Sequence, residues 1–482
     1  MFFINKKLIK KNINMKKIFL VTLFLANILF AFSNEVYEKA VVDERMELMS
    51  VVFRLAEAEE YLANAFPLYV DEIDKHFAKY KEHSLIEFTK VLRKKHWMSF
   101  DAIADMAISL KIKNGKIEFN KDIKIETLDD RWPQDSIPKY IKLLNDFYKK
   151  TKFHDFFIKN ENLLKAAEEN FAKNVTDKID FEWFKSFFRV LPDKKFKIII
   201  YFTGMNNFGP KIVYKDGTEE YYAIISSYSN RRNKENIPTY EDKYGGYKNI
   251  LIHEICHSFV DSPINEYLEK LLPQATVFYQ LYQKELYEYA LCGAPEYFLG
   301  ETFVRACMSI YDNEQYGEYD EYMLREEVRI GFLWLPQLIK AFEKYKNDTT
   351  YKTFRDFMPE IVILQNSLNP QQLYDEVATI TGTNITNNSD SVDYNLDHIK
   401  VYLNKPMLTK RTYTTSIYAQ PKLEFTEEAK WNAEATEWTF YIKLEPNTQY
   451  EIWFPYAIFS DAKNQYYTRN TYILNFKTRP KQ

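Results

Sequence analysis

The spacing of hydrophobic residues changes along this chain of 482 residues, and that change constrains its fold more than any other feature. From Val36 to about Asn170, apolar side chains recur every three or four residues with charges between them, which is typical of amphipathic helices. From residue 396 onward they alternate with polar residues, as in Trp438 to Leu444, which is typical of strands with one buried face. The sequence therefore predicts a helical region followed by an all-β region.

A small sheet is expected inside the helical region. The run Phe196–Phe202 is β-branched and aromatic, and Lys211–Tyr214 and Tyr221–Ser226 predict two further strands joined by a turn at Asp216–Gly217. Helical spacing then returns over residues 247–345. Breaks in this second helical region are expected near Pro263, near Pro273 and at Gly293–Pro295.

The segment after the second helical region is polar and has no apolar period. We therefore expect an α+β protein: a mostly helical domain with a small mixed sheet over residues 34–380, a linker over 381–395 and a small antiparallel β-sandwich over 396–482.

The first 33 residues have the features of a secretory signal peptide. Basic residues follow Met15, an apolar stretch runs from Ile18 to Phe30, and Ala31-Phe32-Ser33 offers the small residues that a signal peptidase requires. The apolar stretch is shorter than the ~20 residues of a membrane-spanning helix. The sequence predicts an exported protein that is secreted, periplasmic or attached to the cell surface.

Charge and cysteine content narrow the possible partners. Subtracting the six lysines of residues 1–33 from the chain's net charge of −3 leaves −9, which makes nucleic acid an unfavourable partner. The three cysteines, Cys256, Cys292 and Cys307, are too few for a disulfide scaffold, and their odd number leaves at least one thiol unpaired.

The motif His253-Glu254-Ile255-Cys256-His257 carries the clearest chemistry in the chain. On a helix, histidines four residues apart lie on one face and can both bind zinc, while the glutamate can take a proton from a water that the metal activates. With 7 histidines in 482 residues, chance would produce such a motif about 0.01 times. The alternative is a solvent-facing helix that carries these residues by accident.

A carboxylate is expected as the third metal ligand. Val260 and Pro263 exclude the longer motif with a third histidine, and the only histidine further along the chain is His398. Glu301 is favoured because it lies in a largely apolar helical stretch, where a carboxylate needs a partner. Glu296 is the reserve candidate. The other acidic residues considered are Asp261, Glu266, Glu269, Glu285 and Glu288.

Two bland interpretations stand beside this site. Glu301 and Arg305 are four residues apart, so they can form an ordinary helical ion pair, and Arg305 can equally support a ligating Glu301. The acidic cluster from Asp312 to Glu327 is expected to be a solvated surface, because it lacks the spacing of a calcium-binding loop.

The stretch Ile252–Val260, together with Glu301–Ala306, resembles the bacterial domain of unknown function 4932, an exported family related to gluzincin zinc peptidases. The resemblance covers about residues 45–370. It implies a zincin-like fold in which His253, His257 and Glu301 bind zinc and Glu254 is the catalytic base.

The C-terminal region resembles a bacterial Ig-like domain. Tyr402–Met407, Leu444–Tyr450 and Asn475–Thr478 are similar to its start, its middle turn and its last strand. The resemblance implies a module that spaces or docks the preceding domain, possibly at the cell surface or envelope, and a fold of this kind does not by itself define a ligand.

Together these features predict an exported zinc metallopeptidase that hydrolyses a peptide or protein substrate. The alternative is a cell-surface binding or adhesion protein in which the zinc domain is vestigial or structural. An intact Glu254 argues against a purely structural site, which is normally closed by four protein ligands.

Overall fold

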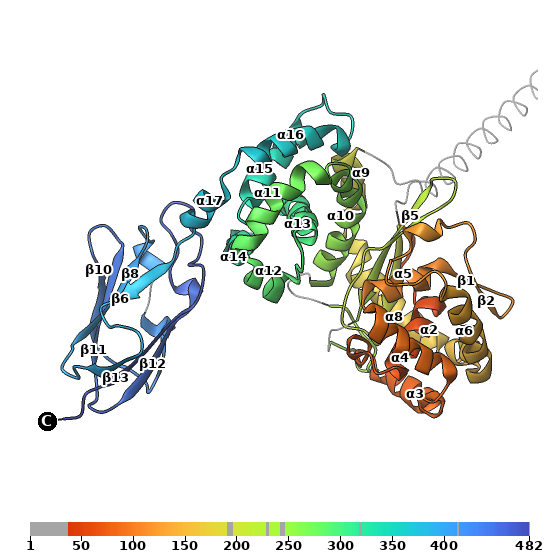
Figure 1. Cartoon of the computed structure of the whole chain (residues 1–482), viewed down its shortest axis with the longest axis horizontal. Coiled ribbons are helices and arrows are strands. Elements are labelled where there is room, and N and C mark those ends of the chain that lie inside the picture. The colour runs from red at the N-terminus through yellow and green to blue at the C-terminus, as the bar shows by residue number, and fades with distance from the viewer. Residues whose placement is uncertain are drawn as a thin grey trace, which may run out of the picture. The chain divides into compact units, whose positions relative to one another are not determined.

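The computed structural model describes residues 37–189, 196–227, 231–241, 246–317, 321–411 and 414–481. The chain forms two compact units, one up to Ser258 and one from Phe259, and the division falls within helix α10 (Gly246–Glu266) (Figure 1). The signal peptide predicted over residues 1–33 lies outside the described residues. Among the described helices, none combines the length and apolar character needed to cross a bilayer.

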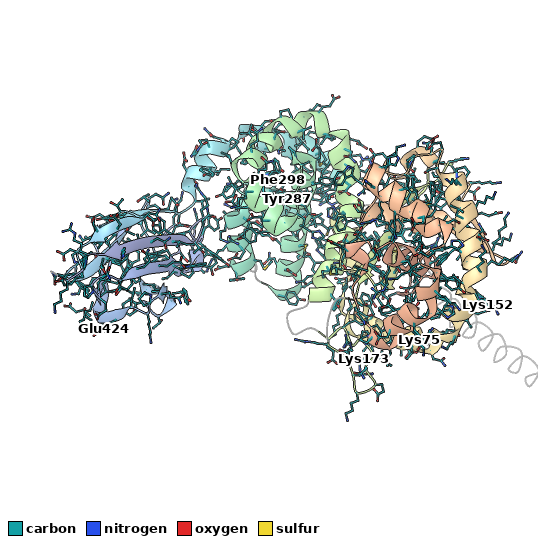
Figure 2. The ribbon with its side chains drawn as sticks, turned by 60° about the horizontal axis from the view of Figure 1, so that its bottom comes forward. Lys75, Lys152, Lys173, Tyr287, Phe298 and Glu424 are labelled. Atoms are coloured by element: carbon teal, nitrogen blue, oxygen red, sulfur yellow. The ribbon has the colours of Figure 1, made fainter. Side chains whose placement is uncertain are left out.

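The first unit is mostly helical, as the periodicity of residues 36–170 predicts. In α6, for example, Tyr140, Leu144 and Phe147 recur at helical spacing and are fully buried. Exposed lysines such as Lys75 and Lys173 lie on the solvent faces (Figure 2). The helices are α2 (Glu44–Leu55), α3 (Pro67–Phe77), α4 (Ser84–His96), α5 (Asp101–Ser109), α6 (Ile137–Thr151), α7 (Phe153–Lys159), α8 (Glu161–Asn174) and α9 (Phe181–Phe188).

One hairpin interrupts this helical region and was not predicted. Strands β1 (Leu110–Lys113) and β2 (Lys116–Phe119) pair antiparallel around Asn114-Gly115. Both turn residues have positive φ, 52° and 71°, which Asn and Gly tolerate best. The Asn-Gly pair is therefore the signal that identifies this hairpin in the sequence.

The predicted small mixed sheet is confirmed. It contains β3 (Lys197–Tyr201), β4 (Lys211–Val213) and β5 (Glu219–Ser226) in the order β3-β5-β4. Strand β3 runs parallel to β5, whereas β4 and β5 form the predicted antiparallel hairpin. Gly217 in its turn has φ of 90°, a conformation that favours glycine. Strand β4 lies at one edge of the sheet.

Glu47 on α2 is a fully buried carboxyl group in the first unit. Burial raises the pKa of Glu47 from 4.5 to about 8, although hydrogen bonds with Tyr69 and the Phe202 amide oppose the shift. The folded chain therefore holds this proton to a higher pH than the unfolded chain. The associated stability is complete below pH 4.5 and is lost as the pH rises toward 8.

We expect Glu47→Gln to remove this pH dependence. Relative to the variant, the wild-type protein should lose about 1–3 kcal/mol of unfolding free energy between about pH 5 and pH 8. Urea unfolding at the two pH values measures the difference. Parallel pH curves for the two proteins would contradict the assignment.

The second unit begins with a helical region. Its helices are α11 (Leu268–Leu281), α12 (Gln283–Ala290), α13 (Pro295–Tyr316), α14 (Glu321–Ile330), α15 (Leu335–Asn347), α16 (Phe354–Ser367) and α17 (Pro370–Glu376). The break predicted at Gly293–Pro295 is confirmed, since α13 begins at Pro295.

The breaks predicted near Pro263 and Pro273 are wrong, because both prolines lie inside helices. An interior proline costs a helix about 3 kcal/mol. Helix α11 packs against α13, α16 and α17 and buries Leu271, Ala275 and Phe278, so tertiary packing offsets that cost.

The C-terminal region is a β-sandwich of two four-stranded sheets, with strand orders β10-β11-β8-β6 and β7-β13-β12-β9. Their strands are β6 (Ile380–Thr383), β7 (Ser389–Val392), β8 (His398–Leu403), β9 (Tyr418–Gln420), β10 (Glu424–Trp431), β11 (Glu437–Lys443), β12 (Gln449–Phe454) and β13 (Tyr472–Thr478). Alternate residues of both sheets share one core, including Val401, Phe440, Ile452 and Phe476. The predicted α+β class, with strands following the helices, is confirmed.

The linker predicted over residues 381–395 is wrong, and so is the expectation of purely antiparallel pairing. Most of β6 and all of β7 lie in this segment, and the sandwich core already begins at Ala378. Strand β6 pairs antiparallel with β8, and β7 pairs parallel with β13. Both are short strands at the sheet edges, held mainly by backbone hydrogen bonds. Their polar side chains therefore show no alternating apolar pattern.

Candidate metal centre

Helix α10 presents both histidines of the motif on one face. Leu251, Ile255 and Cys256 are fully buried, whereas His253 and His257 are only half-buried. The apolar residues hold the helix against the core, and the four-residue spacing aligns the two imidazoles. Their Nε2 atoms lie 3.2 Å apart.

Glu301 on α13 completes a three-residue cluster. One ligand atom from each of His253, His257 and Glu301 lies within 4.8 Å of the others. Within the second unit, a Cβ added at Gly300 would lie 3.8 Å from Asp261 Oδ1, so the last turns of α10 run beside α13 immediately before Glu301. The reserve candidate Glu296 is exposed and is not part of the cluster.

The cluster fits a small tetrahedral cation. Two nitrogen ligands at about 2.1 Å from a tetrahedral zinc ion are about 3.3 Å apart, close to the 3.2 Å between the two Nε2 atoms. Two imidazoles and one carboxylate also match the ligand sets of zinc sites that leave one position open. His253, His257 and Glu301 are therefore the residues that can hold a metal.

Glu254 lies beside the cluster and is 9% exposed. The loop that follows β3 approaches it closely: a Cβ added at Gly209 would lie 2.9 Å from the Glu254 carbonyl oxygen and 3.2 Å from its Oε2. Three hydrogen bonds hold this loop. The Tyr201 hydroxyl donates to Asn206 O at 2.6 Å, Ser226 Oγ donates to Gly204 O at 2.5 Å, and the Ser226 amide donates to Asn207 Oδ1 at 2.9 Å.

Gly209 is required at this position because no side chain fits between the loop and α10. We expect Gly209→Ala to lower the unfolding free energy by about 1–3 kcal/mol, since a rigid backbone carbonyl blocks the added methyl group. Gly293→Ala is the matched control, because no atom lies within 4 Å of its added Cβ. Urea unfolding of both variants tests the contact, and equal stabilities would contradict it.

Arg305 connects Glu301 to a second carboxylate. Its guanidinium bonds to Glu301 Oε2, and its Nε donates to Glu327 Oε2 at 2.7 Å. It also stacks on Phe332, 4.2 Å from the ring centroid. Burial lowers the pKa of Arg305, but the charges of Glu327 and Glu301 outweigh burial and raise it above its ordinary value. The predicted Glu301–Arg305 ion pair therefore coexists with the cluster.

Glu327 is the residue of this site that the sequence did not reveal. The acidic stretch from Asp312 to Glu327 was expected to be a solvated surface, but the Glu327 side chain is only 15% exposed and is paired with Arg305. The expectation is wrong for this residue, because a pairing across 22 positions depends on how α13 and α14 meet.

The three cysteines are buried and unoxidised. Burial raises the pKa of Cys292 to about 12, and the charge of Glu301 adds to the shift. A thiol held neutral in this way is a poor nucleophile and a poor metal ligand. Cys256 is a small core residue, as the sequence suggests.

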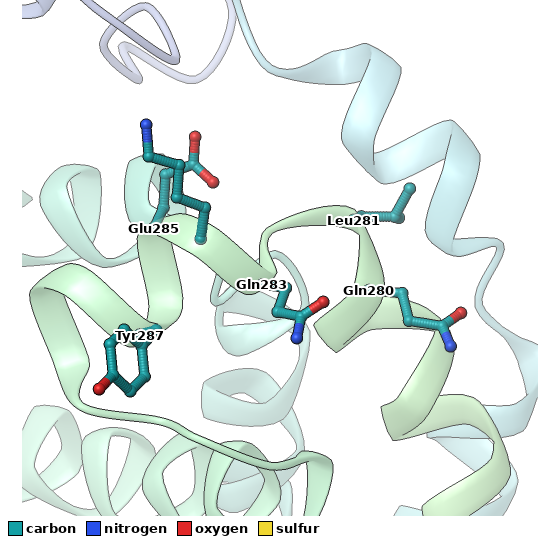
Figure 3. Close-up of a pocket in the computed structure, with 6 residues that line it drawn as sticks. Gln280, Leu281, Gln283, Glu285 and Tyr287 are labelled. Carbon is teal, nitrogen blue, oxygen red and sulfur yellow. The ribbon is translucent and has the colours of Figure 1, made fainter.

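A shallow pocket of about 490 Å³ lies elsewhere, at the turn between α11 and α12 (Figure 3). It is lined by Gln280, Leu281, Gln283, Lys284, Glu285 and Tyr287. None of these residues belongs to the motif or the cluster, so the pocket contributes nothing to the metal centre.

Fold and site together define an α+β protein whose central helix carries a His-Glu-x-x-His motif, with a glutamate from a second helix beside it. The chain matches the family described as Domain of unknown function (DUF4932) over residues 39–364, and it belongs to that family. The family resemblance of the motif is thereby confirmed.

Other comparisons add little. No curated protein matches the chain. Among solved structures, surface layer protein SbsC, domains 1–6, is 13% identical with a TM-score of 0.19, and the match covers 48% of this chain and 33% of that one. The N-terminal part of the bacterial S-layer protein SbsC is also 13% identical, with a TM-score of 0.18 and coverage of 48% and 58%. Scores this low support no argument about fold or function.

Proposed function

We propose that this protein is an exported zinc-dependent metallopeptidase of the gluzincin kind. The observation that carries the proposal is the convergence of His253, His257 and Glu301, with a nearly buried Glu254 next to the first histidine in sequence. A structural zinc site is normally closed by four protein ligands, whereas this cluster supplies three.

The chemistry follows from the residue types. Zinc, when bound, supplies a Lewis acid that polarises the scissile carbonyl and makes water a stronger nucleophile. Glu254 takes the proton from the attacking water and returns it to the leaving amine. Its low exposure limits competition from bulk water, and the close approach of Gly209 holds its backbone in place.

A peptide or protein is the proposed substrate class. Strand β4 lies at the sheet edge, and the residues just before it, Phe208–Pro210, bond to β5 and pass directly over Glu254. An extended peptide can add to such an edge through backbone hydrogen bonds. The scissile bond would then lie close to the catalytic base.

The remaining parts of the chain fit an exported enzyme. We propose that residues 15–33 direct export and that the C-terminal sandwich is an Ig-like module that spaces or docks the catalytic part at the cell surface or envelope. Fractionation of cells that express the full chain tests the export, since retention of uncleaved protein in the cytoplasm would contradict it.

Elemental mass spectrometry of the purified protein tests the metal. The expected result is about one zinc per chain, together with peptide cleavage that a chelator abolishes and added zinc restores. A protein that binds no zinc after incubation with the metal would overturn the proposal.

Glu327 should affect zinc affinity without touching the metal. In Glu327→Gln the Arg305 charge is balanced only by Glu301, so the guanidinium competes more strongly with zinc for that carboxylate. We expect zinc affinity to fall about 10–100-fold, as for other residues that orient a metal ligand. Glu326→Gln is the matched control, because Glu326 pairs with Arg329 instead. Competition with a zinc-binding dye measures both, and equal affinities would contradict this role.

A further inference from the structure

The loop between α4 and α5, residues 97–100, exposes two aromatic side chains. Trp97 is 82% exposed and Phe100 is 44% exposed, whereas Met98 between them is fully buried. Val91, on the preceding turns of α4, is 56% exposed. These side chains place apolar surface in water at one end of α4.

The backbone of this loop is held in an uncommon conformation. Trp97 and Phe100 have φ of 54° and 53°, values that favour glycine or asparagine and cost free energy for an aromatic residue. A polar residue or glycine would close the same turn with less strain. Since burial does not repay the aromatic side chains, the fold of the chain gives no reason for them.

Hydrogen bonds make the loop rigid. The carbonyl of Met98 accepts from Arg93 Nη1 at 3.0 Å, that of Ser99 from Arg131 Nη1 at 3.1 Å, and that of Phe100 from the Tyr61 hydroxyl at 3.3 Å. The aromatic side chains therefore project from an ordered backbone. A partner that buries them pays little entropy for ordering the loop.

The charge beside the loop is positive, against the net negative charge of the chain. Lys94 and Lys95 are exposed on the last turn of α4. Within the described part of the chain, neither ammonium group has a carboxylate within 4 Å, whereas Arg93 is paired with Glu60 and Arg131 with Asp101. Two uncompensated cations thus stand next to two exposed aromatic rings.

From this juxtaposition we propose that the 97–100 loop and the end of α4 bind the surface of an anionic lipid bilayer. Trp and Phe side chains enter the interfacial region, where an aromatic ring is more stable than in water, and Lys94 and Lys95 contact acidic headgroups. The rest of an acidic chain would be repelled by such a surface, so this patch sets the orientation of binding. The proposal does not depend on the metal centre.

Vesicle flotation with the full protein tests it, using phosphatidylcholine vesicles with and without about 30 mol% phosphatidylglycerol. We expect binding to the anionic vesicles that weakens with salt, and a blue shift of tryptophan fluorescence that is absent in Trp97→Phe. Replacing Lys94 and Lys95 together by glutamine should lower the partition coefficient about 30-fold. Trp97→Ala should lower it further.

Matched controls separate these residues from charge and aromaticity in general. Lys75→Gln with Lys173→Gln removes the same charge elsewhere in the first unit, and Trp453→Ala removes another exposed tryptophan. The proposal is overturned if the control variants lose as much binding as the loop variants, or if the wild-type protein binds neither vesicle. Self-association that requires Trp97 and proceeds without lipid would also overturn it, in favour of a protein partner.

Discussion

Replacing Glu254 by glutamine is expected to lower the rate of peptide hydrolysis by about 10²–10⁴-fold while the protein retains its zinc. Glutamine keeps the size and the hydrogen-bonding reach of the side chain but cannot accept a proton from water. Because Glu254 is not one of the three clustered ligands, its replacement leaves the metal-binding residues intact. Zinc content and cleavage rate should therefore respond differently to this substitution.

Glu266→Gln is the matched control for this experiment. It makes the same chemical change on the same helix, at an exposed position near its C-terminal end. Its cleavage rate should equal that of the wild-type protein. If Glu254→Gln cleaves as fast as this control, Glu254 is not the general base and the observed cleavage comes from another group or a contaminating enzyme.

Replacing Glu301 by alanine is expected to weaken zinc binding by at least about 100-fold, so that the purified variant contains almost no zinc. The two histidines alone are a weak zinc site, because a tetrahedral ion would then need two ligands from solvent. The fold should survive, since Arg305 keeps its ion pair with Glu327 after Glu301 is removed. Elemental mass spectrometry and circular dichroism of the same sample measure both effects.

Glu296→Ala is the control for Glu301. Glu296 is on the same helix and was the other carboxylate considered, but its side chain is exposed and is not part of the cluster. We expect this variant to retain about one zinc per chain. Loss of zinc from Glu296→Ala together with retention in Glu301→Ala would reverse the ligand assignment.

The interactions of Glu301 explain why both readings of this residue had merit. As a helical ion pair, Glu301 and Arg305 would need no metal. The geometry adds Glu327, which gives Arg305 a second carboxylate and leaves one oxygen of Glu301 available to the cluster. A ligand and its electrostatic support thus lie within α13 and α14.

Several features of this protein follow from the sequence alone. The motif helix, the mixed sheet with its Asp216-Gly217 hairpin and the alternating strands after residue 396 were all predicted from patterns within about twenty residues. Local spacing is sufficient here because one side of each element is buried. The β1–β2 hairpin was missed, although Asn114-Gly115 announces it just as locally.

Tertiary structure decided what depends on how those elements meet. It selected Glu301 over Glu296, placed Glu327 against Arg305, brought Gly209 onto Glu254 and carried α11 through Pro273. Each of these contacts joins separate elements, or outweighs a local preference through packing. The type of chemistry was therefore legible in a five-residue motif, whereas the completed site required the packing of helices whose contacts no local period encodes.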